Sequence, residues 1–162
     1  MYDEIEYPEI DPNKKSAKEL WEGRYAADKY VFGKEPVLSL KHFVGVLQKG
    51  KALDIAMGEG RNTVFLAQQG FQAEGVDCSR KAIDRALALA TEKGVTIDAK
   101  VQNLDFFLMP LMKYDTIILS YYRPQARFFS EIRRGLVLGG TFLLEAYTTE
   151  QVRLQKTPNP QL

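Results

Sequence analysis

The stretch Lys51-Ala-Leu-Asp-Ile-Ala-Met-Gly-Glu-Gly-Arg-Asn62 contains the signals from which the fold can be predicted. It opens with a short apolar run, residues 52–55, which is typical of a buried strand. Small residues and two glycines follow, and residues 62–69 then have the pattern of a helix that stops at Gly70. A strand, a glycine turn and a helix N-terminus in this order let the backbone approach a ligand closely. Because many glycine turns bind nothing, the downstream sequence has to support this interpretation.

A second strand is predicted over residues 72–77, and it ends in the carboxylate of Asp77. This acid lies 17 positions after Gly60, about where nucleoside-binding folds place a carboxylate on the ribose hydroxyls. The turn itself differs from a dinucleotide site. It reads Asp-x-Ala-x-Gly-x-Gly from Asp54, instead of Gly-x-Gly-x-x-Gly, and no glycine follows at the third fingerprint position.

Residues 51–62 resemble motif I of the class I S-adenosylmethionine-dependent methyltransferases, usually written Leu-Asp-x-Gly-Cys-Gly-x-Gly. Residues 75–79, Gly-Val-Asp-Cys-Ser, are similar to the second motif of that family, and Gly-Glu-Gly-Arg-Asn resembles its tellurite-resistance-type small-molecule branch. Ala56 stands where the family has its first glycine, and Met57 stands where it often has cysteine. If the backbone of Ala56 must adopt a positive φ, its methyl group is expected to weaken cofactor binding.

Length and composition set limits on the other possibilities. The chain has 162 residues, of which 45% are hydrophobic and 27% charged, so it fits one domain with a real core. A net charge of +1, with scattered Lys and Arg, favours neither a nucleic-acid nor a membrane partner. One cysteine, Cys78, suits a reducing compartment, and we expect a cytoplasmic protein. His42 is the only histidine, so we expect no Ser-His-Asp triad and no metal site.

Three regions are predicted within the single domain: an acidic lead-in over residues 1–15, an N-terminal helical lid over 16–50, and a cofactor-binding core over 51–162. Ser16 and Glu19 have the spacing of a capping box, which starts the first helix of the lid.

The lid also resembles the methyltransferase family. The pattern Trp21-x-x-Arg24-Tyr25, followed by Phe-Gly-x-Glu-Pro at 32–36, matches the segment that covers the cofactor there. The resemblance implies that Arg24 holds the carboxylate of the cofactor's methionine part, for which a guanidinium is suited. The alternative is that Trp21 and Tyr25 are aromatic residues that only pack the helix.

Strand and helix signals alternate along the whole chain. The predicted strands are 52–55, 72–77, 95–102, 116–120 and 141–147, and the predicted helices after the first are 38–48, 62–69, 79–93 and one with Pro124 at its first position. This alternation indicates an α/β fold with a mainly parallel sheet. The resemblance implies a Rossmann-like three-layer αβα sandwich in strand order 3-2-1-4-5, in which a Leu-Gly-Gly turn at 138–140 precedes the fifth strand. The family's last two strands are expected to be lacking.

The resemblance also implies a set of site residues. Those expected to bind S-adenosyl-L-methionine, and its product S-adenosyl-L-homocysteine, are Arg24, Tyr25, Asp54, Ala56, Gly58, Gly60, Asn62, Asp77, Cys78, Asn103, Leu104 and Ser120. Asn103 stands where the family often has an acid that contacts the adenine, although a plain loop asparagine explains it equally well. Tyr121 and Tyr122 follow the fourth strand and are the candidates for orienting the methyl acceptor.

The predicted function is methyl transfer from S-adenosylmethionine to a small molecule. The sulfonium is already activated, so positioning and water exclusion suffice, and a base is optional for an anionic acceptor. The alternative is a cofactor-binding or scaffold protein of the same fold without turnover. Residues 141–147 are apolar and form an edge strand in this scheme, which predicts a homo-oligomer through that edge.

Overall fold

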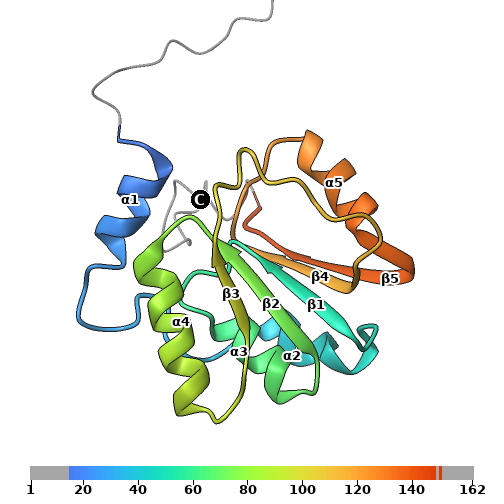
Figure 1. Cartoon of the computed structure of the whole chain (residues 1–162), viewed down its shortest axis with the longest axis horizontal. Helices are drawn as coiled ribbons and strands as arrows, with labels where there is room; N and C mark the ends of the chain where they lie inside the picture. Colours follow the sequence, from blue (N-terminus) through green and yellow to red (C-terminus); the bar gives the residue numbers. More distant parts are fainter. Residues whose placement is uncertain (1–14, 149, 151–162) are drawn as a thin grey trace, which may run out of the picture.

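The computed structural model describes residues 15–148 and 150 of the chain. Its centre is one sheet of five parallel strands in the order β3-β2-β1-β4-β5, as predicted (Figure 1). The strands are β1 (Lys51–Ile55), β2 (Gln72–Asp77), β3 (Asp98–Val101), β4 (Tyr114–Ser120) and β5 (Leu136–Glu145). Residues 1–14 of the predicted lead-in, and the chain after residue 148 apart from residue 150, lie outside the described residues.

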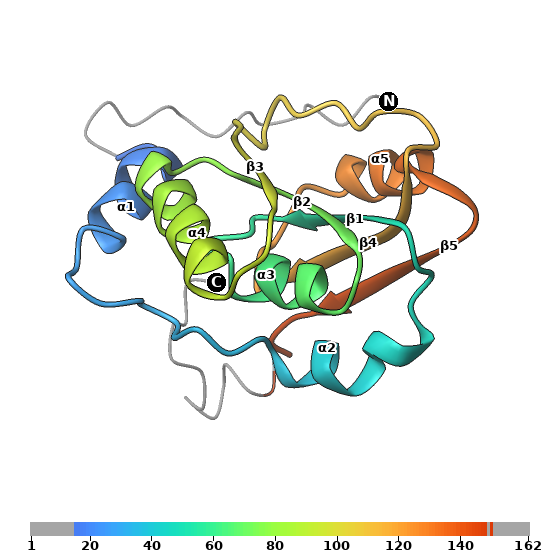
Figure 2. The same ribbon diagram turned by 60° about the horizontal axis from the view of Figure 1, so that its bottom comes forward.

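Helices cover both faces of the sheet, which makes the three-layer αβα sandwich (Figure 2). The helices are α1 (Ala17–Arg24), α2 (Leu38–Phe43), the short 3-10 helix η1 (Val44–Val46), α3 (Arg61–Gln68), α4 (Arg80–Glu92) and α5 (Arg127–Gly135). Figure 2 shows α2, α3 and α4 on one face and α5 on the other. Two separate apolar cores lie on these two faces.

The central strand β1 decides where a ligand can bind. It pairs with β2 on one side and β4 on the other, and residues 52–55 are buried, as expected for a strand covered on both faces. All the strands are parallel, so the carboxyl ends of β1, β2 and β4 meet at one edge of the sheet. In open α/β sheets, ligands bind at that edge.

Several predicted boundaries were wrong. The strand expected over 95–102 is limited to β3, Asp98–Val101, and the strand expected over 141–147 spans Leu136–Glu145. The helix expected over 38–48 ends as an α-helix at Phe43 and continues as η1. Helix α5 starts at Arg127 and not at Pro124, because residues 125–128 first form a turn closed by the bond from Phe128 N to the carbonyl of Gln125 (2.9 Å). The turn expected at 138–140 lies inside β5, which absorbs a left-handed Gly139 (φ 78°) through a shift of register against β4.

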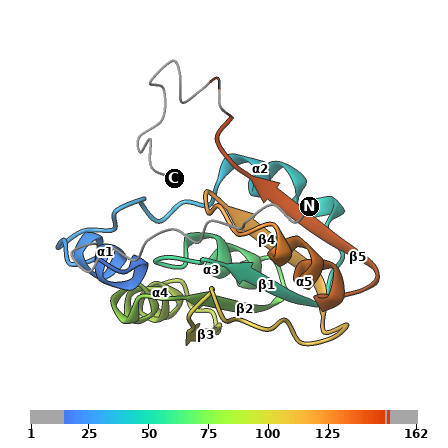
Figure 3. The same ribbon diagram turned by 90° about the horizontal axis from the view of Figure 1, so that it is seen from above.

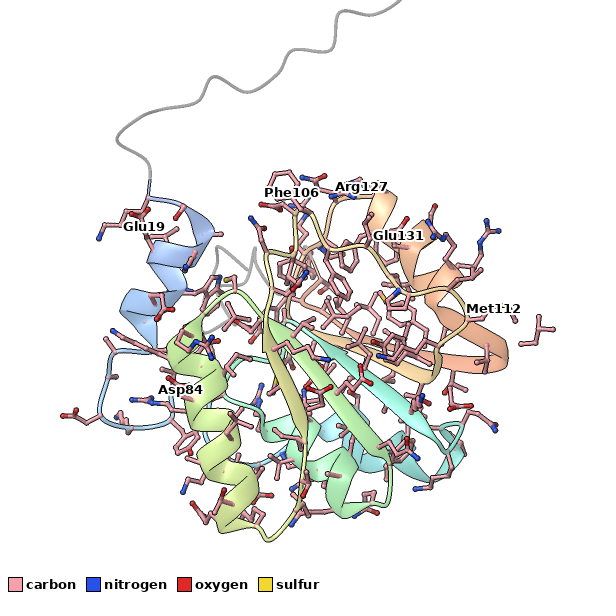
Figure 4. The ribbon with its side chains drawn as sticks, in the orientation of Figure 1. Glu19, Asp84, Phe106, Met112, Arg127 and Glu131 are labelled. Carbon is pink, nitrogen blue, oxygen red and sulfur yellow. The ribbon has the colours of Figure 1, made fainter. Side chains whose placement is uncertain are left out.

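The connection from β3 to β4, residues 102–113, contains no helix. Phe106, Leu108, Leu111 and Met112 are exposed along it, while Met109 is buried against α5 and the sheet. Figure 4 shows Phe106 beside Arg127 at one end of the molecule, and Met112 close to the opposite end of the connection. The guanidinium of Arg127 donates to the carbonyl of Asp105, which ties this connection to α5.

Strands β3 and β5 are the two edges of the sheet among the described residues (Figure 3). The outer strand β5 carries Phe142 and Leu144, which are 36% and 45% exposed, and Phe142 meets the ring of Phe129 from α5. This face is the most apolar exposed part of the sheet.

Candidate functional site

A cavity of about 280 Å³ lies at the carboxyl ends of β1, β2 and β4. The N-terminal segment, residues 16–50, contributes Trp21, Tyr25, Phe32 and Gly33 to its wall. The remaining lining residues come from the sheet edge and its loops: Ala56, Met57, Gly58, Glu59, Arg61, Asn62, Asp77, Cys78, Leu104, Ser120, Tyr121, Tyr122 and Tyr147. The site is therefore built where the sheet topology predicts it, under a cover of aromatic side chains.

The turn from β1 to α3 has three residues in the left-handed region: Ala56 (φ 56°), Gly58 (φ 53°) and Gly60 (φ 85°). Glycine is suited to such angles, whereas Ala56 adopts one at a cost in strain. A methyl group on Gly58 would lie 2.9 Å from the hydroxyl of Tyr25, and one on Gly60 would lie 2.5 Å from Cβ of Ala86. The first glycine therefore lets the hydroxyl of Tyr25 pack against the turn, and the second lets the turn pack against α4.

The carboxylate of Asp77 is the best-placed acceptor in the cavity wall. It is 6% exposed, and it accepts hydrogen bonds from the backbone N–H groups of Gly58 and Ser79, both at 2.9 Å. These bonds join the end of β2 to the glycine turn. Burial raises the pKa of Asp77, and hydrogen bonds from the backbone of Ser79, Gly58 and Cys78 and from the thiol of Cys78 oppose that rise. An ionised carboxylate on the cavity wall only accepts hydrogen bonds, which suits Asp77 to ligand hydroxyls.

Asp54, at the end of β1, is buried behind the turn and does not line the cavity. Its carboxylate accepts a hydrogen bond of 2.7 Å from the hydroxyl of Thr63 on α3. Burial, together with the nearby charge of Asp77, raises the pKa of Asp54 to about 7. The position indicates that Asp54 braces the turn from behind.

Two polar side chains attach the N-terminal segment to the turn. Glu59 accepts from the backbone N–H of Val31 (2.7 Å) and forms an ion pair with Arg85 of α4 (2.6 Å). Asn62 accepts from the backbone N–H of Val37 (2.9 Å), and its amide also donates to Ser120 (3.3 Å). The cover is thus held in place by buried hydrogen bonds as well as by its aromatic rings.

Arg24 and Arg61 have different positions relative to the cavity. Arg24 does not line the cavity, and its guanidinium lies 4.8 Å from the ring centre of Trp21. Arg61, the first residue of α3, does line the cavity and donates to the carbonyl of Phe32 at 3.0 Å. Of the pair, Arg61 is the cation on the cavity wall.

Trp21 and Tyr25 form a stacked pair with ring centres 5.5 Å apart. Tyr25 is 4% exposed, and burial beside Asp77 and Glu59 raises the pKa of its hydroxyl. These residues both pack the cover and line the cavity, so their packing role leaves them in position to contact a ligand.

Tyr121 follows the last residue of β4 with a positive φ of 55°. Its hydroxyl donates to the carboxylate of Glu145, and its ring stacks on Tyr147 with centres 4.6 Å apart. Tyr122 also lines the cavity and is half-buried. Both tyrosines named as candidates from the sequence therefore lie on the wall.

Of the residues expected to bind the cofactor, eight line the cavity: Tyr25, Ala56, Gly58, Asn62, Asp77, Cys78, Leu104 and Ser120. Four do not: Arg24, Asp54, Gly60 and Asn103. The side chain of Asn103 accepts from the backbone N–H of Asp105 (3.0 Å), which fits the alternative of a plain loop asparagine.

Seven lining residues are absent from the set expected to bind the cofactor. Trp21, Phe32 and Gly33 belong to the predicted lid segment, and the others are Met57, Glu59, Arg61 and Tyr147. Met57, Glu59 and Arg61 lie within the turn motif at residues 51–62, so their place in that motif could have identified them as cavity residues. Within the described residues, no cluster of His, Cys, Asp and Glu is arranged to hold a metal ion. No helix in that part of the chain is long and apolar enough to cross a membrane.

Comparison with known proteins adds a family to this geometry. The sequence profile of the family described as "Methyltransferase domain" matches residues 52–140, which include the turn, Asp77 and both candidate tyrosines. No curated protein matches the sequence.

Solved structures share the fold at low sequence identity. A methyltransferase from Thiobacillus denitrificans, solved with S-adenosyl-L-homocysteine, is 18% identical, with a TM-score of 0.63, over 83% of this chain and 60% of that one. The phosphoethanolamine N-methyltransferase 1 of Haemonchus contortus is 16% identical, with a TM-score of 0.67, over 83% and 32%. A Pyrococcus horikoshii protein is 23% identical, with a TM-score of 0.61, over 74% and 54%. The chain spans little more than half the length of several such structures.

Proposed function

This chain belongs to the methyltransferase-domain family, and we propose that it transfers a methyl group from S-adenosylmethionine to a small-molecule acceptor. The observation that carries the proposal is the buried carboxylate of Asp77, which lies on the cavity wall at the end of β2 and next to the glycine turn. A nucleoside cofactor needs an acceptor for two ribose hydroxyls at that place in the fold.

The lining residues fit such a cofactor. Gly58 lies on the cavity wall, and because it has no side chain the hydroxyl of Tyr25 can pack against the turn there. Asp77 would hold the ribose hydroxyls, Leu104 and Cys78 would contact the adenine, and Arg61 would face the carboxylate of the amino-acid part. Arg61 takes the role first assigned to Arg24, since Arg61 is the arginine on the wall.

The cofactor supplies an activated methyl group on a sulfonium. The protein's part is then to orient the acceptor and to exclude water. Trp21, Tyr25 and Phe32 cover the cavity with apolar rings, while Tyr121 and Tyr122 present hydroxyl-bearing rings at the end of β4. These two tyrosines are the residues that would orient the acceptor.

The second candidate function is cofactor binding without turnover. The left-handed Ala56 favours it, because a side chain occupies a strained position of the turn that lines the cavity. A scaffold of this kind would retain S-adenosylhomocysteine or S-adenosylmethionine but would form no methylated product.

Finer features remain part of the same proposal. The Gly-Glu-Gly-Arg-Asn sequence supports a place in the tellurite-resistance-type branch and hence a small acceptor. The exposed apolar side of β5 supports self-association through the sheet edge. The low cysteine content supports a cytoplasmic location.

Isothermal titration calorimetry with S-adenosylhomocysteine and S-adenosylmethionine tests the proposal. We expect both to bind with one site per chain and micromolar dissociation constants. Absence of binding at millimolar cofactor would refute both candidate functions. Binding, followed by product formation in an acceptor screen by mass spectrometry, separates the enzyme from the scaffold.

A further inference from the structure

Three polar side chains from distant parts of the sequence meet beside the cavity. The hydroxyl of Tyr121 donates to one carboxylate oxygen of Glu145, and the hydroxyl of Ser39 on α2 donates to the other. The backbone N–H of Tyr121 also donates to the carbonyl of Glu145, at 2.8 Å. The carboxylate is therefore held at a defined position directly behind the tyrosine hydroxyl.

The ring of Tyr121 is held just as firmly. Its backbone adopts a left-handed φ of 55°, which is uncommon and costly for a bulky residue. The ring stacks on Tyr147 at an interplanar angle of 29°. Left-handed bulky residues persist where the surrounding structure determines them, and they are concentrated at functional sites.

Tyr121 lines the main cavity and also a second hollow of about 330 Å³ next to it. The two share Phe32, Gly33 and Arg61 in their walls, and Glu145 lines only the second. The tyrosine thus stands between the cofactor cavity and a neighbouring space that is open to an acceptor.

The direction of the hydrogen bond decides what this tyrosine can do. Burial and the Glu145 carboxylate raise the pKa of Tyr121, so the phenol stays protonated. Its hydroxyl therefore donates a hydrogen bond to the carboxylate. The remaining lone pair of its oxygen can then accept a hydrogen bond from another molecule. The other charged or titratable groups that act on the phenol are Arg61 and Tyr147, and Arg61 favours an electron-rich oxygen there.

We propose that Tyr121 and Glu145 form a proton-accepting pair for a methyl acceptor that enters the site as a neutral thiol or hydroxyl; this inference rests on the proposed function. The acceptor's X–H proton moves to the oxygen of Tyr121, whose own proton moves to the carboxylate of Glu145. The electron pair of X forms the bond to the methyl carbon, and the sulfur keeps the pair of the broken C–S bond.

The first test measures binding alone. Sinefungin carries an ammonium group where the cofactor carries its methylated sulfur, so it donates hydrogen bonds toward the acceptor side. We expect the protein to bind sinefungin at least tenfold more tightly than S-adenosylhomocysteine at pH 7. Tyr121→Phe and Glu145→Gln should each reduce this preference to about threefold or less, because one charge-assisted hydrogen bond is worth about tenfold or more.

The chain provides a matched control. Tyr114 is the first residue of β4, the strand that Tyr121 follows, and its hydroxyl donates to the carboxylate of Glu74 at 2.9 Å, at the end of the sheet away from the cavity. Tyr114→Phe and Glu74→Gln remove the same chemistry there and should leave the preference unchanged. The inference is overturned if the wild type shows no preference for sinefungin over S-adenosylhomocysteine. It is also overturned if Tyr121→Phe and Glu145→Gln keep that preference. In both cases the proposed function stands. Failure of both ligands to bind the wild type overturns the proposed function itself.

The second test addresses the acceptor. Benzyl mercaptan is a neutral thiol at pH 7, whereas 4-nitrothiophenol is a thiolate, and S-adenosylhomocysteine release reports turnover of either. Glu145→Gln should lower kcat/KM for benzyl mercaptan about 100-fold, the usual size of a general-base effect, and should change it less than threefold for 4-nitrothiophenol. Equal losses for the two thiols, turnover of the thiolate alone, or turnover of neither would overturn the proposal for the acceptor.

Discussion

Replacing Asp77 by asparagine tests the cofactor site most directly, because the change removes the charge and keeps the size of the side chain. In the wild type, the carboxylate accepts from the N–H groups of Gly58 and Ser79, at 2.9 Å each. An amide has one acceptor oxygen, so one of these two donors loses its partner. Each such bond to a charged group is worth about 1.5–3 kcal/mol, which is partly offset because a buried charge is removed. We expect a moderate loss of stability and a folded variant.

The effect on the cofactor should be larger than any general effect of the substitution. The ribose hydroxyls would lose at least one charge-assisted bond to Asp77, worth about 1.5–3 kcal/mol. At about 1.4 kcal/mol per factor of ten, the dissociation constant for S-adenosylhomocysteine should rise about 10- to 150-fold. Asp77→Ala, which removes both acceptor oxygens, should weaken binding at least tenfold as well.

Titration calorimetry at pH 7.5, together with thermal melts, checks this expectation. Glu74→Gln is the matched control, since Glu74 lies on the same strand but pairs with Lys113 (2.7 Å) and Tyr114 at the other end. Ligand hydroxyls favour the ionised Asp77, whose pKa is raised by burial. The wild type should therefore bind more weakly as the pH falls, and Asp77→Asn should lose this dependence. An unchanged dissociation constant in folded Asp77→Asn would refute the assignment.

Three further predictions follow from single positions. Ala56→Gly should relieve about 1 kcal/mol of left-handed strain and tighten S-adenosylhomocysteine binding about two- to fivefold by calorimetry; an equal affinity would show that the turn tolerates alanine. The pKa of Asp54 is raised from 3.8 to about 7 in the folded state. Between these pH values the folded state holds a proton that the unfolded state has released, so the free energy of unfolding should fall by up to about 4 kcal/mol as the pH rises. Asp54→Asn, which can still accept from Thr63, should flatten this dependence in melts from pH 5 to pH 8, and parallel profiles would contradict the reasoning. The wild type should self-associate at tens of micromolar in light scattering, and Phe142→Asp should abolish this; a monodisperse wild-type monomer would count against the edge interface.

The features that sequence reasoning predicted well depend on local signals and on one topological rule. The strand, glycine turn and helix over residues 51–68 are adjacent in the chain, so their pattern could be recognised directly. Asp77 could be placed because parallel strands bring their carboxyl ends to one edge. The strand order followed in the same way from the alternation of elements, together with the family resemblance.

The features that could not be predicted depend on contacts between distant segments. Helix α1 has no buried residue, so nothing in its eight residues decides which way Arg24 points. Its guanidinium lies over the ring of Trp21, while Arg61 reaches the cover by donating to a carbonyl 29 residues away in the sequence. A side chain's identity gives its chemistry, but its partner depends on how the cover docks on the sheet.

The two tyrosines at the ends of β4, Tyr114 and Tyr121, show why position has to be argued separately from residue type. Tyr114 opens β4 and Tyr121 follows its last residue. Tyr114 donates its hydroxyl to Glu74 of β2, two strands away, and Tyr121 donates its hydroxyl to Glu145 of the adjacent β5. The Tyr114–Glu74 bond lies at the amino end of the strands, where the lysine ion pair of Glu74 completes a structural cluster. The Tyr121–Glu145 bond lies at the carboxyl end, on the wall of a cavity and beside a left-handed backbone. Only the second pair stands where a parallel α/β sheet exposes its ligands, so a functional consequence is expected of it alone.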